Sequence, residues 1–565
     1  MKGLAIDYAV LLPALVPVAG LVLVLVADLV NPRLRRVPYA IAALAALGAA
    51  AATVPGLALG GGSTRETFCL TGRNPAAGAA SATGATGSLP GVDGLPQVCL
   101  WQADALAGTL QLAAAVSAIV CIALAWPRTR RQRPDDSTRE PVEAVLLLAA
   151  LSGTVVVAAS RDVGTWLVAL ELATLPVIAL VALSGRRSAV AGATQLLVTS
   201  LVSFALLVLG VALWFAGTGS PFLTPDAALS SGGAFSGVPG TASVTVTQAA
   251  GAVVQPSVSG GVVALATVLV VAGVGFKLSL VPFHAWTPTA YAGSSVPIAT
   301  FLATVSKVAA LAALLVVLRA VAVLGTPAVL AIAVLAALSM TLGNVMALRQ
   351  HDVVRLLAWS TVAQAGWVVL PLVSISALGV GASATYLLTY VVATLVAFAV
   401  VAVTLRDRPG RGRSIADYEG LWQRSPWRAG ALVLALTSLA GLPPGVIGLV
   451  GKVTALRPVV AEGWVWLAVV AAVNAVIGVA VYLRWLRAVI TEREVAEVGQ
   501  GVGPELGPGV GPEGAPTQPG GESGGESAAL PATRARPVAV VGLVLASAVL
   551  VVVSVQPDLL LRLLG

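Results

Sequence analysis

Charged residues are scarce in this sequence, and lysines are especially few. Only 10% of the 565 residues are charged, whereas 58% are hydrophobic and the mean hydropathy is +0.94. Soluble domains carry about a quarter charged residues. A chain of this length could not hide so much apolar surface in one aqueous core. A soluble globular protein is therefore excluded, and the lipid bilayer is the expected solvent.

Cysteine is almost absent too. The three cysteines, Cys69, Cys99 and Cys121, form no CxxC pair, which argues against an iron–sulfur cluster or a structural zinc site on this chain. Cys69 and Cys99 share one loop. They form a disulfide there in an oxidising compartment, or they stay as two free thiols, and the sequence leaves both readings open. The only two histidines, His284 and His351, are too far apart in sequence to suggest a metal site.

Apolar windows of roughly 20 residues, the length that crosses a hydrocarbon core, recur along the chain. They predict an all-α polytopic membrane protein of about 14 transmembrane helices. The first two helices occupy 1–59, and 104–141 holds the third helix and a basic cytoplasmic loop. The predicted spans are 9–28, 38–59, 104–126, 142–160, 163–184, 189–215, 261–281, 297–319, 326–347, 353–373, 381–404, 429–456, 464–487 and 537–557.

Two hydrophilic segments interrupt this pattern. Residues 60–103 are rich in small residues and are expected to form an external loop. Residues 491–535, rich in Gly, Pro and Glu, are expected to be a flexible cytoplasmic linker before the C-terminal helix of 536–565.

The net charge of +8 comes from arginines in short clusters between the spans. This is the pattern of cytoplasmic membrane loops, so nucleic-acid binding is not indicated. The clusters follow alternate spans, and an even number of spans then puts both termini outside. The clustered residues are Arg33, Arg35, Arg36, Arg128, Arg130, Arg131, Arg133, Arg139, Arg186, Arg187, Arg349, Arg355, Arg406, Arg408, Arg411, Arg413, Arg484, Arg487 and Arg493.

The four lysines are placed differently from the arginines. Three of them, Lys277, Lys307 and Lys452, lie inside apolar windows, as does the isolated carboxylate Glu171. A charge at the centre of a membrane helix costs roughly 2.5–3.5 kcal/mol. A buried lysine can gain and lose a proton, whereas a guanidinium stays charged. The set predicts a proton relay; the alternative is that lysines near helix ends snorkel to the interface.

Prolines next to two of these lysines predict broken helices. Pro282 and Pro288 follow Lys277, and Pro443 and Pro444 precede Lys452. Broken helices in corresponding places of two halves are typical of transport sites in inverted repeats, although a simple proline kink fits the same pattern. His284 lies in the first break and is a candidate proton relay or a structural hydrogen-bonding residue.

These residues occur in segments that resemble subunit N of bacterial NADH-quinone oxidoreductase, the respiratory complex I. The segments are GFKLSLVPFHAWTPTAYAGSSVPIATFLATVSK, LGNVMALRQHDVVRLLAWSTVAQAGW and SLAGLPPGVIGLVGK. The resemblance implies two inverted five-helix antiporter-like repeats, 142–320 and 321–490, with broken seventh and twelfth helices. It also implies that Glu171 pairs with Lys277, that Lys307 is the central relay and that Lys452 leads to the outer side.

The same resemblance sets the expected cofactors and partners. This chain holds no cofactor, and quinone, NADH, FMN and iron–sulfur clusters belong to partner subunits. The partners are other membrane subunits of complex I and the lipid bilayer, in the plasma membrane of a bacterium. The chain is thus expected to be a subunit of a proton-translocating enzyme. The alternatives are a membrane subunit of a cation/proton antiporter or of a membrane-bound hydrogenase, or a structural subunit that does not pump.

Two positions depart from the family pattern. The family usually has a lysine on the sixth helix, where this chain has Gln195, which cannot carry a charge. The family loop TPDVYEG reads TPTAYAG here, so that Thr289 and Ala292 stand in place of two acids. These changes put the tuning of the Glu171–Lys277 pair in question.

Overall fold

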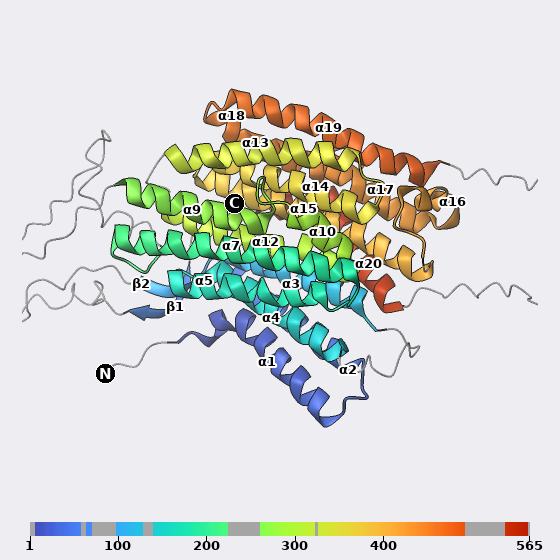
Figure 1. Ribbon diagram of the computed structural model, residues 1–565, viewed down its shortest axis with the longest axis horizontal. Coiled ribbons are helices and arrows are strands. Elements are labelled where there is room, and N and C mark those ends of the chain that lie inside the picture. Colours follow the sequence, from blue (N-terminus) through green and yellow to red (C-terminus); the bar gives the residue numbers. More distant parts are fainter. Residues whose placement is uncertain are drawn as a thin grey trace, which may run out of the picture.

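Long helices run side by side along one direction of the molecule in the computed structural model (Figure 1). The structure describes residues 6–57, 64–70, 98–127, 139–223, 260–321, 326–408, 410–491 and 537–562. The predicted linker 491–535, apart from its first residue, and much of the predicted loop 60–103 lie outside these residues, as do Arg128, Arg130, Arg131, Arg133 and Arg493.

Thirteen helical spans in the described residues are long and apolar enough to cross a membrane. The fourteenth predicted span, 429–456, is a broken pair, α17 and α18. Each half has 15 or 16 residues, or about 24 Å at most, which is less than the bilayer core. The predicted fold class, a polytopic all-α membrane protein with broken seventh and twelfth helices, is confirmed.

The elements follow one another in this order: α1 (Tyr8–Val30), α2 (Val37–Leu57), β1 (Arg65–Leu70), β2 (Val98–Ala103), α3 (Ala105–Ala125), α4 (Arg139–Ala159), α5 (Val163–Leu172), α6 (Leu175–Ala182), α7 (Arg187–Thr218), α9 (Gly260–Leu278), α10 (Trp286–Gly293), α11 (Val296–Ala303), α12 (Val305–Ala320), α13 (Thr326–Leu348), α14 (Val353–Val369), η3 (Leu370–Val373), α15 (Ala377–Asp407), η4 (Ile415–Tyr418), α16 (Leu421–Arg424), α17 (Pro426–Ala440), α18 (Val446–Ala461), α19 (Val465–Ile490), α20 (Pro537–Val555) and α21 (Asp558–Arg562).

Three spans form the centre of the bundle. The spans 296–320, 353–373 and 377–407 are each 94% buried, whereas the other spans are 28–67% buried. The outer helices keep leucine and valine side chains exposed, as expected for surfaces that face lipid. The three central spans therefore supply most of the protein-lined interior in which polar groups can be sheltered.

A matching pair of backbone contacts relates the two five-helix units, α4–α12 and α13–α19. In each unit an aspartate, Asp162 or Asp352, caps the second helix, and the flanking backbone pairs with the segment that follows the third helix. The bonds run from Val163 N–H to Pro221 O and from Leu223 N–H to Arg161 O in the first unit, and from Val353 N–H to Arg413 O and from Ile415 N–H to His351 O in the second.

These two contacts lie at opposite ends of the bundle. Arg161 also pairs with Leu100 of β2, at the hairpin end, whereas Arg413 lies at the end where arginines gather. Equivalent features that point in opposite directions are what inverted repeats produce. The boundaries 142–320 and 321–490 stay a prediction.

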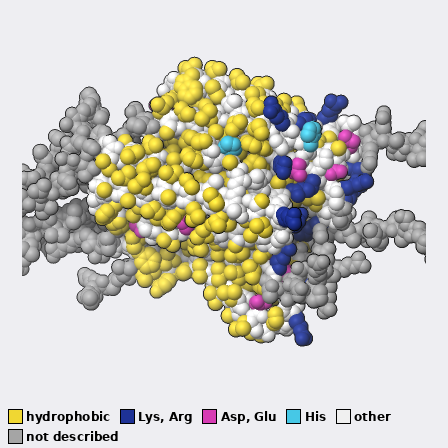
Figure 2. Space-filling model, viewed as in Figure 1, with side chains coloured by type: hydrophobic (Ala, Val, Ile, Leu, Met, Phe, Trp, Pro, Cys, Tyr) yellow, Lys and Arg dark blue, Asp and Glu magenta, His cyan; other side chains and the backbone are white. Residues whose placement is uncertain are grey.

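Arginines gather at one end of the molecule, which we call the basic end (Figure 2). The described members of the predicted arginine clusters all belong to loops and helix ends on this side. Four other arginines, Arg65, Arg161, Arg319 and Arg457, belong to segments toward the opposite end.

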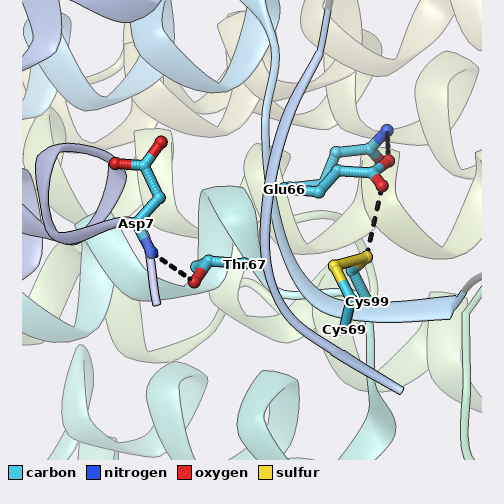
Figure 3. The surroundings of a disulfide bond; sticks show 6 residues. Asp7, Glu66, Thr67, Cys69 and Cys99 are labelled. Atoms are coloured by element: carbon cyan, nitrogen blue, oxygen red, sulfur yellow. Dashed lines mark hydrogen bonds between the residues drawn. A yellow bond between two sulfur atoms is a disulfide. The ribbon is translucent and has the colours of Figure 1, made fainter. Parts of the chain in front are cut away.

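A short antiparallel hairpin, which the sequence did not predict, lies at that opposite end. Strands β1 and β2 pair Cys69 with Cys99, and the two cysteines form a disulfide (Figure 3). The N–H group of Asp7, the residue that caps α1, donates to the Thr67 hydroxyl and ties the hairpin to the start of α1. A Glu66 carboxylate oxygen lies 3.2 Å from Cys99 Sγ, but a disulfide sulfur carries no hydrogen, so this contact is not a hydrogen bond.

The disulfide gives a direct test by thiol labelling. In denatured protein that has not been reduced, we expect a maleimide–polyethylene glycol reagent to modify one cysteine, Cys121, because Cys69 and Cys99 are joined. After reduction all three cysteines should react, and gel mobility reports the number. The Cys121→Ser variant is the control and should show no modification before reduction. Three modified cysteines without reductant would show that the bond does not form.

Candidate functional site

The three buried lysines and Glu171 all sit next to interruptions in their helices. Glu171 is the penultimate residue of α5, and Lys277 lies in the last turn of α9. Lys307 follows the interruption at Thr304 between α11 and α12, so it is not at the centre of an unbroken helix as the sequence suggested. Lys452 lies on α18, after the break that follows α17. Interruptions free backbone carbonyl groups, which can then accept hydrogen bonds from ammonium groups.

Lys277 makes a direct ion pair with Glu171, as the resemblance implied. Its Nζ lies 2.9 Å from Glu171 Oε1 and donates a second bond to the Thr174 hydroxyl at 2.8 Å. The Lys277 side chain is 5% exposed and that of Glu171 is 14% exposed. Thr174 lies between α5 and α6, where its side chain is available because the helix is interrupted.

Lys307 is joined to the same break. Its Nζ donates to the backbone carbonyl of Lys277 at 2.9 Å and to the Ser279 hydroxyl at 2.6 Å, and it lies 4.7 Å from the centre of the Trp286 ring. The negative end of the α9 dipole therefore faces this ammonium group. Ser279 has a φ of +70°, a left-handed conformation that costs a non-glycine residue about 1–3 kcal/mol and is typical of functional sites.

A small cavity adjoins the first two lysines. It has a volume of about 30 Å³, and Lys277, Thr174 and Ser306 are among its lining residues. The Ser306 hydroxyl is buried and has no hydrogen-bond partner among the described residues. A space of this size with polar groups in its wall can hold one or two water molecules, which would hydrate the Lys277 side of the row.

Lys452 repeats this arrangement at the second break. Its Nζ donates to the Ala440 carbonyl, at the C-terminal end of α17, and lies 5.5 Å from the centre of the Trp367 ring. Both Lys307 and Lys452 thus combine a half-helix carbonyl with an aromatic face. All three ammonium groups bond inside the protein, so snorkelling does not describe these lysines.

A second group of polar side chains lies beside Lys452, and the sequence reasoning missed it. The Tyr386 hydroxyl donates to Gln364 Oε1, and Gln364 Nε2 donates to the Tyr482 hydroxyl at 2.9 Å and to the Leu439 carbonyl at 3.4 Å. Tyr386 stacks on Trp367, the ring that Lys452 faces. The available signal was Gln364 itself, an uncharged polar residue in an otherwise apolar window.

The row has one gap. No hydrogen bond between described side chains joins the Lys307 group to the Gln364 group. The polar residues nearest to filling it are Thr361 and Tyr390, whose hydroxyl groups bond to each other at 2.9 Å. Proton transfer across this interval requires water.

His284 lies in the break between α9 and α10, as predicted, and is half-buried. Its ring centre is 5.3 Å from that of Trp359, and it makes no contact with the lysines that the structure records. His351 lies in the turn before α14, where its carbonyl accepts from Ile415. The structure therefore brings Glu171, Lys277 and Lys307 together and leaves His284 outside that group.

The two departures from the family pattern contact each other. The Thr289 hydroxyl donates to Gln195 Oε1 at 2.6 Å, and Gln195 Nε2 donates to the Ala285 carbonyl at 3.2 Å. Gln195 thus packs on the break, and it is its neighbour Leu196 that lines the cavity beside Lys277. With the family's lysine and acid, these positions would hold an ion pair. This chain holds a neutral hydrogen-bonded pair there.

An ionic cluster holds the far end of α12. Asp104, which caps α3, bonds Arg319 at 2.7 Å and lies 3.6 Å from Arg161. Burial by itself would raise the pKa of Asp104, but the two guanidinium groups outweigh it and hold this pKa below its usual range. Burial lowers the pKa of Arg161 to about 10, which leaves it charged at neutral pH. The helix that carries Lys307 is therefore anchored to α3 and to the α4–α5 turn.

This combination, broken helices in inverted repeats around a buried row of lysines, defines an antiporter-like membrane subunit. Residues 160–478 match the family described as NADH:quinone oxidoreductase/Mrp antiporter, transmembrane. The chain is 37% identical over 490 residues to NADH-quinone oxidoreductase subunit N of Salinispora tropica, covering 85% of this chain and 84% of that protein. The chain belongs to this family of complex I and antiporter membrane subunits, and it resembles subunit N.

Solved structures give the same result. A chain of respiratory complex I from Thermus thermophilus, determined with bound aureothin, is 27% identical and superposes with a TM-score of 0.67, covering 97% of this chain and 98% of that one. A chain of the Mrp complex from Dietzia sp. DQ12-45-1b shares the fold, with a TM-score of 0.70, 22% identity and coverage of 99% and 96%.

The neutral pair can be tested by restoring the charges one at a time. Gln195→Lys should lower the free energy of unfolding by about 2 kcal/mol, because it puts an uncompensated cation at membrane depth. The double variant Gln195→Lys with Thr289→Asp should recover most of this loss. The measurement is thermal unfolding of the purified chain in detergent. Equal losses in the single and double variants would show that the two positions are not coupled.

Proposed function

We propose that this chain is a proton-translocating membrane subunit of an NADH:quinone oxidoreductase. Protons move along the buried row of Glu171, Lys277, Lys307 and Lys452 while partner subunits reduce quinone. The observation that carries the proposal is the unbroken set of contacts from Glu171 to Lys277 and, through the end of α9, to Lys307. Moving a proton at one member changes the charge that its neighbour faces at about 3 Å, which is how such a row can transmit a change.

Lys307 is the central member of the proposed relay because it has no carboxylate partner. Its Nζ bonds only to a carbonyl and a hydroxyl among the described residues, and its side chain is buried. Neutral acceptors stabilise an ammonium group less than a carboxylate does, so gain and loss of its proton are closer in free energy. Glu171 then sets the charge state of Lys277. Lys452, with Gln364 and Tyr386, forms the path to the other side of the gap.

His284 and Gln195 have lesser parts in this proposal. His284 contacts Trp359 and no lysine, so we assign it to shaping the break and keep a relay through water as its alternative role. Gln195 keeps α7 against the break without adding a charge. Because the Glu171–Lys277 ion pair is intact beside it, the loss of the family lysine does not by itself make the chain a structural subunit that no longer pumps.

The remaining assignments follow from the family. The chain binds no cofactor; NADH, FMN, iron–sulfur clusters and quinone belong to partner subunits, and other membrane subunits and lipid surround the chain, with no nucleic acid involved. The basic end faces the cytoplasm of a bacterium by the positive-inside rule, and both termini lie outside. The disulfide of the hairpin agrees with this orientation, because it puts the bond in the oxidising compartment.

The relay is tested at Lys307 in the intact complex. Lys307→Met should lower quinone-coupled proton translocation on the order of 100-fold, because a positioned proton-transfer group is lost. Lys307→Arg should fail in the same way, since a guanidinium keeps its charge while its proton stays bound. Proton uptake into sealed vesicles per NADH oxidised is the measurement. Normal pumping by both variants would leave the structural-subunit reading.

A matched pair on α18 controls for loss of positive charge. Lys452→Met should reduce pumping, because Lys452 is buried and bonds to the end of α17. Arg457→Gln removes a cation from an exposed position of the same helix and should leave pumping unchanged. Equal effects of the two changes would mean that the total charge of α18, rather than the relay, determines the rate.

The choice between complex I and an antiporter or hydrogenase assembly is tested by purification. An affinity-tagged chain, extracted in mild detergent, should bring down FMN and iron–sulfur absorbance together with NADH:quinone activity. Recovery of partners without flavin, or of sodium-dependent proton exchange in their place, would favour the antiporter; hydrogen evolution would favour the hydrogenase.

A further inference from the structure

A second cavity, of about 510 Å³, lies at the basic end and takes no part in the lysine row. It is enclosed by the ends of α3, α4, α11 and α15 and by the start of α2. Its lining contains five arginines but only two carboxylates, Glu140 and Glu143. The arginines are Arg35, Arg139, Arg186, Arg406 and Arg413.

The ion pairs within reach do not balance these charges. Arg35 pairs with Glu140 at 3.5 Å, and Arg413 pairs at 3.3 Å with Asp352, which is not part of the lining. The Arg186 side chain makes no hydrogen bond or ion pair with any described residue. Arginines that face one another across a water-accessible space repel unless an anion joins them, so the cavity is built for a negative ligand.

A helix start reinforces this positive potential. Helix α11 begins at the cavity, where Ser294, Ser295, Val296 and Pro297 are lining residues. Ser295, at the N-cap, makes no side-chain hydrogen bond to the first turn. The first N–H groups of a helix lack internal partners, and together with the helix dipole they favour phosphate oxygens.

The position of the cavity favours a lipid over a soluble anion. Half of its wall is apolar and includes Ala125, Trp126 and Leu405, which suits a glycerol backbone and the first carbons of acyl chains. The wall also contains Tyr39 of α2, a helix that exposes Leu44 and Leu47 as lipid-facing side chains do. The cavity lies at the helix ends, the depth at which headgroups lie, and basic pockets at this depth between transmembrane helices bind anionic headgroups.

We propose that the cavity at the basic end binds the phosphate group of an anionic phospholipid from the adjacent leaflet. The phosphate lies between Arg139, Arg186 and the start of α11, and the lipid's acyl chains leave along the apolar wall toward α2. This site is independent of the proton row, and its lipid fixes the ends of α4, α7 and α11 to one another.

The test uses the full-length chain in nanodiscs of phosphatidylcholine that contain a phosphatidylglycerol probe with a photoactivatable headgroup. Cross-linking to the variant Arg139→Gln with Arg186→Gln should fall on the order of 20-fold, because each arginine near an anionic lipid contributes roughly fivefold to binding. The matched control, Arg349→Gln with Arg487→Gln, removes two exposed arginines from the same end outside the cavity and should leave cross-linking unchanged. Equal cross-linking of both variants overturns the proposal.

Two further arms keep the result unambiguous. Millimolar inorganic phosphate should not displace the probe from the wild-type chain; displacement would assign the site to a soluble phosphate and overturn the lipid. If the glutamine pair does not fold, the cross-linked wild-type peptide decides. Attachment within 139–143 or 294–297 supports the site, and attachment only elsewhere refutes it. Arg139→Lys with Arg186→Lys should keep most of the cross-linking, since the charge is retained.

Discussion

A buried ammonium group has to be met by oxygen atoms, and here the ends of broken helices supply them. Lys307 bonds to the last turn of α9 and Lys452 to the last residue of α17. An intact helix uses all its interior carbonyls for its own hydrogen bonds, so it has none to offer. The breaks therefore make the buried lysines affordable at membrane depth, and the surrounding helices shelter the backbone that the breaks expose.

This constraint explains why the most buried spans are also the ones that carry polar residues. Lys307 and Gln364 lie on two of the three central spans, where no lipid reaches them. The inverted relation of the two units, seen in the matching caps of Asp162 and Asp352, places one break in each half of the bundle. One duplicated structural device thus produces two lysine sites, joined across the centre by hydroxyl groups and water.

The Gln195–Thr289 pair shows that a change of charge in such an interior is made at both partners. A lone lysine or a lone acid at these positions would be an unpaired charge on the broken-helix face, whereas the neutral pair satisfies both side chains. The Glu171–Lys277 ion pair nearby is unchanged. The chain has therefore lost a charge pair of the family without losing the contacts of its central row.

The sequence by itself determined the membrane-spanning class, nearly all the spans, the sites of both major breaks and the identity of the four buried charges. These follow from local signals: apolar length, proline, and a charge in an apolar window. Only the tertiary structure decided that Cys69 pairs with Cys99, that Lys307 bonds to the end of α9, and that Gln364 and Tyr386 accompany Lys452. Such contacts join residues far apart in the chain, and uncharged polar residues such as Gln364 and Tyr386 cost too little in an apolar window to stand out before their partners are known.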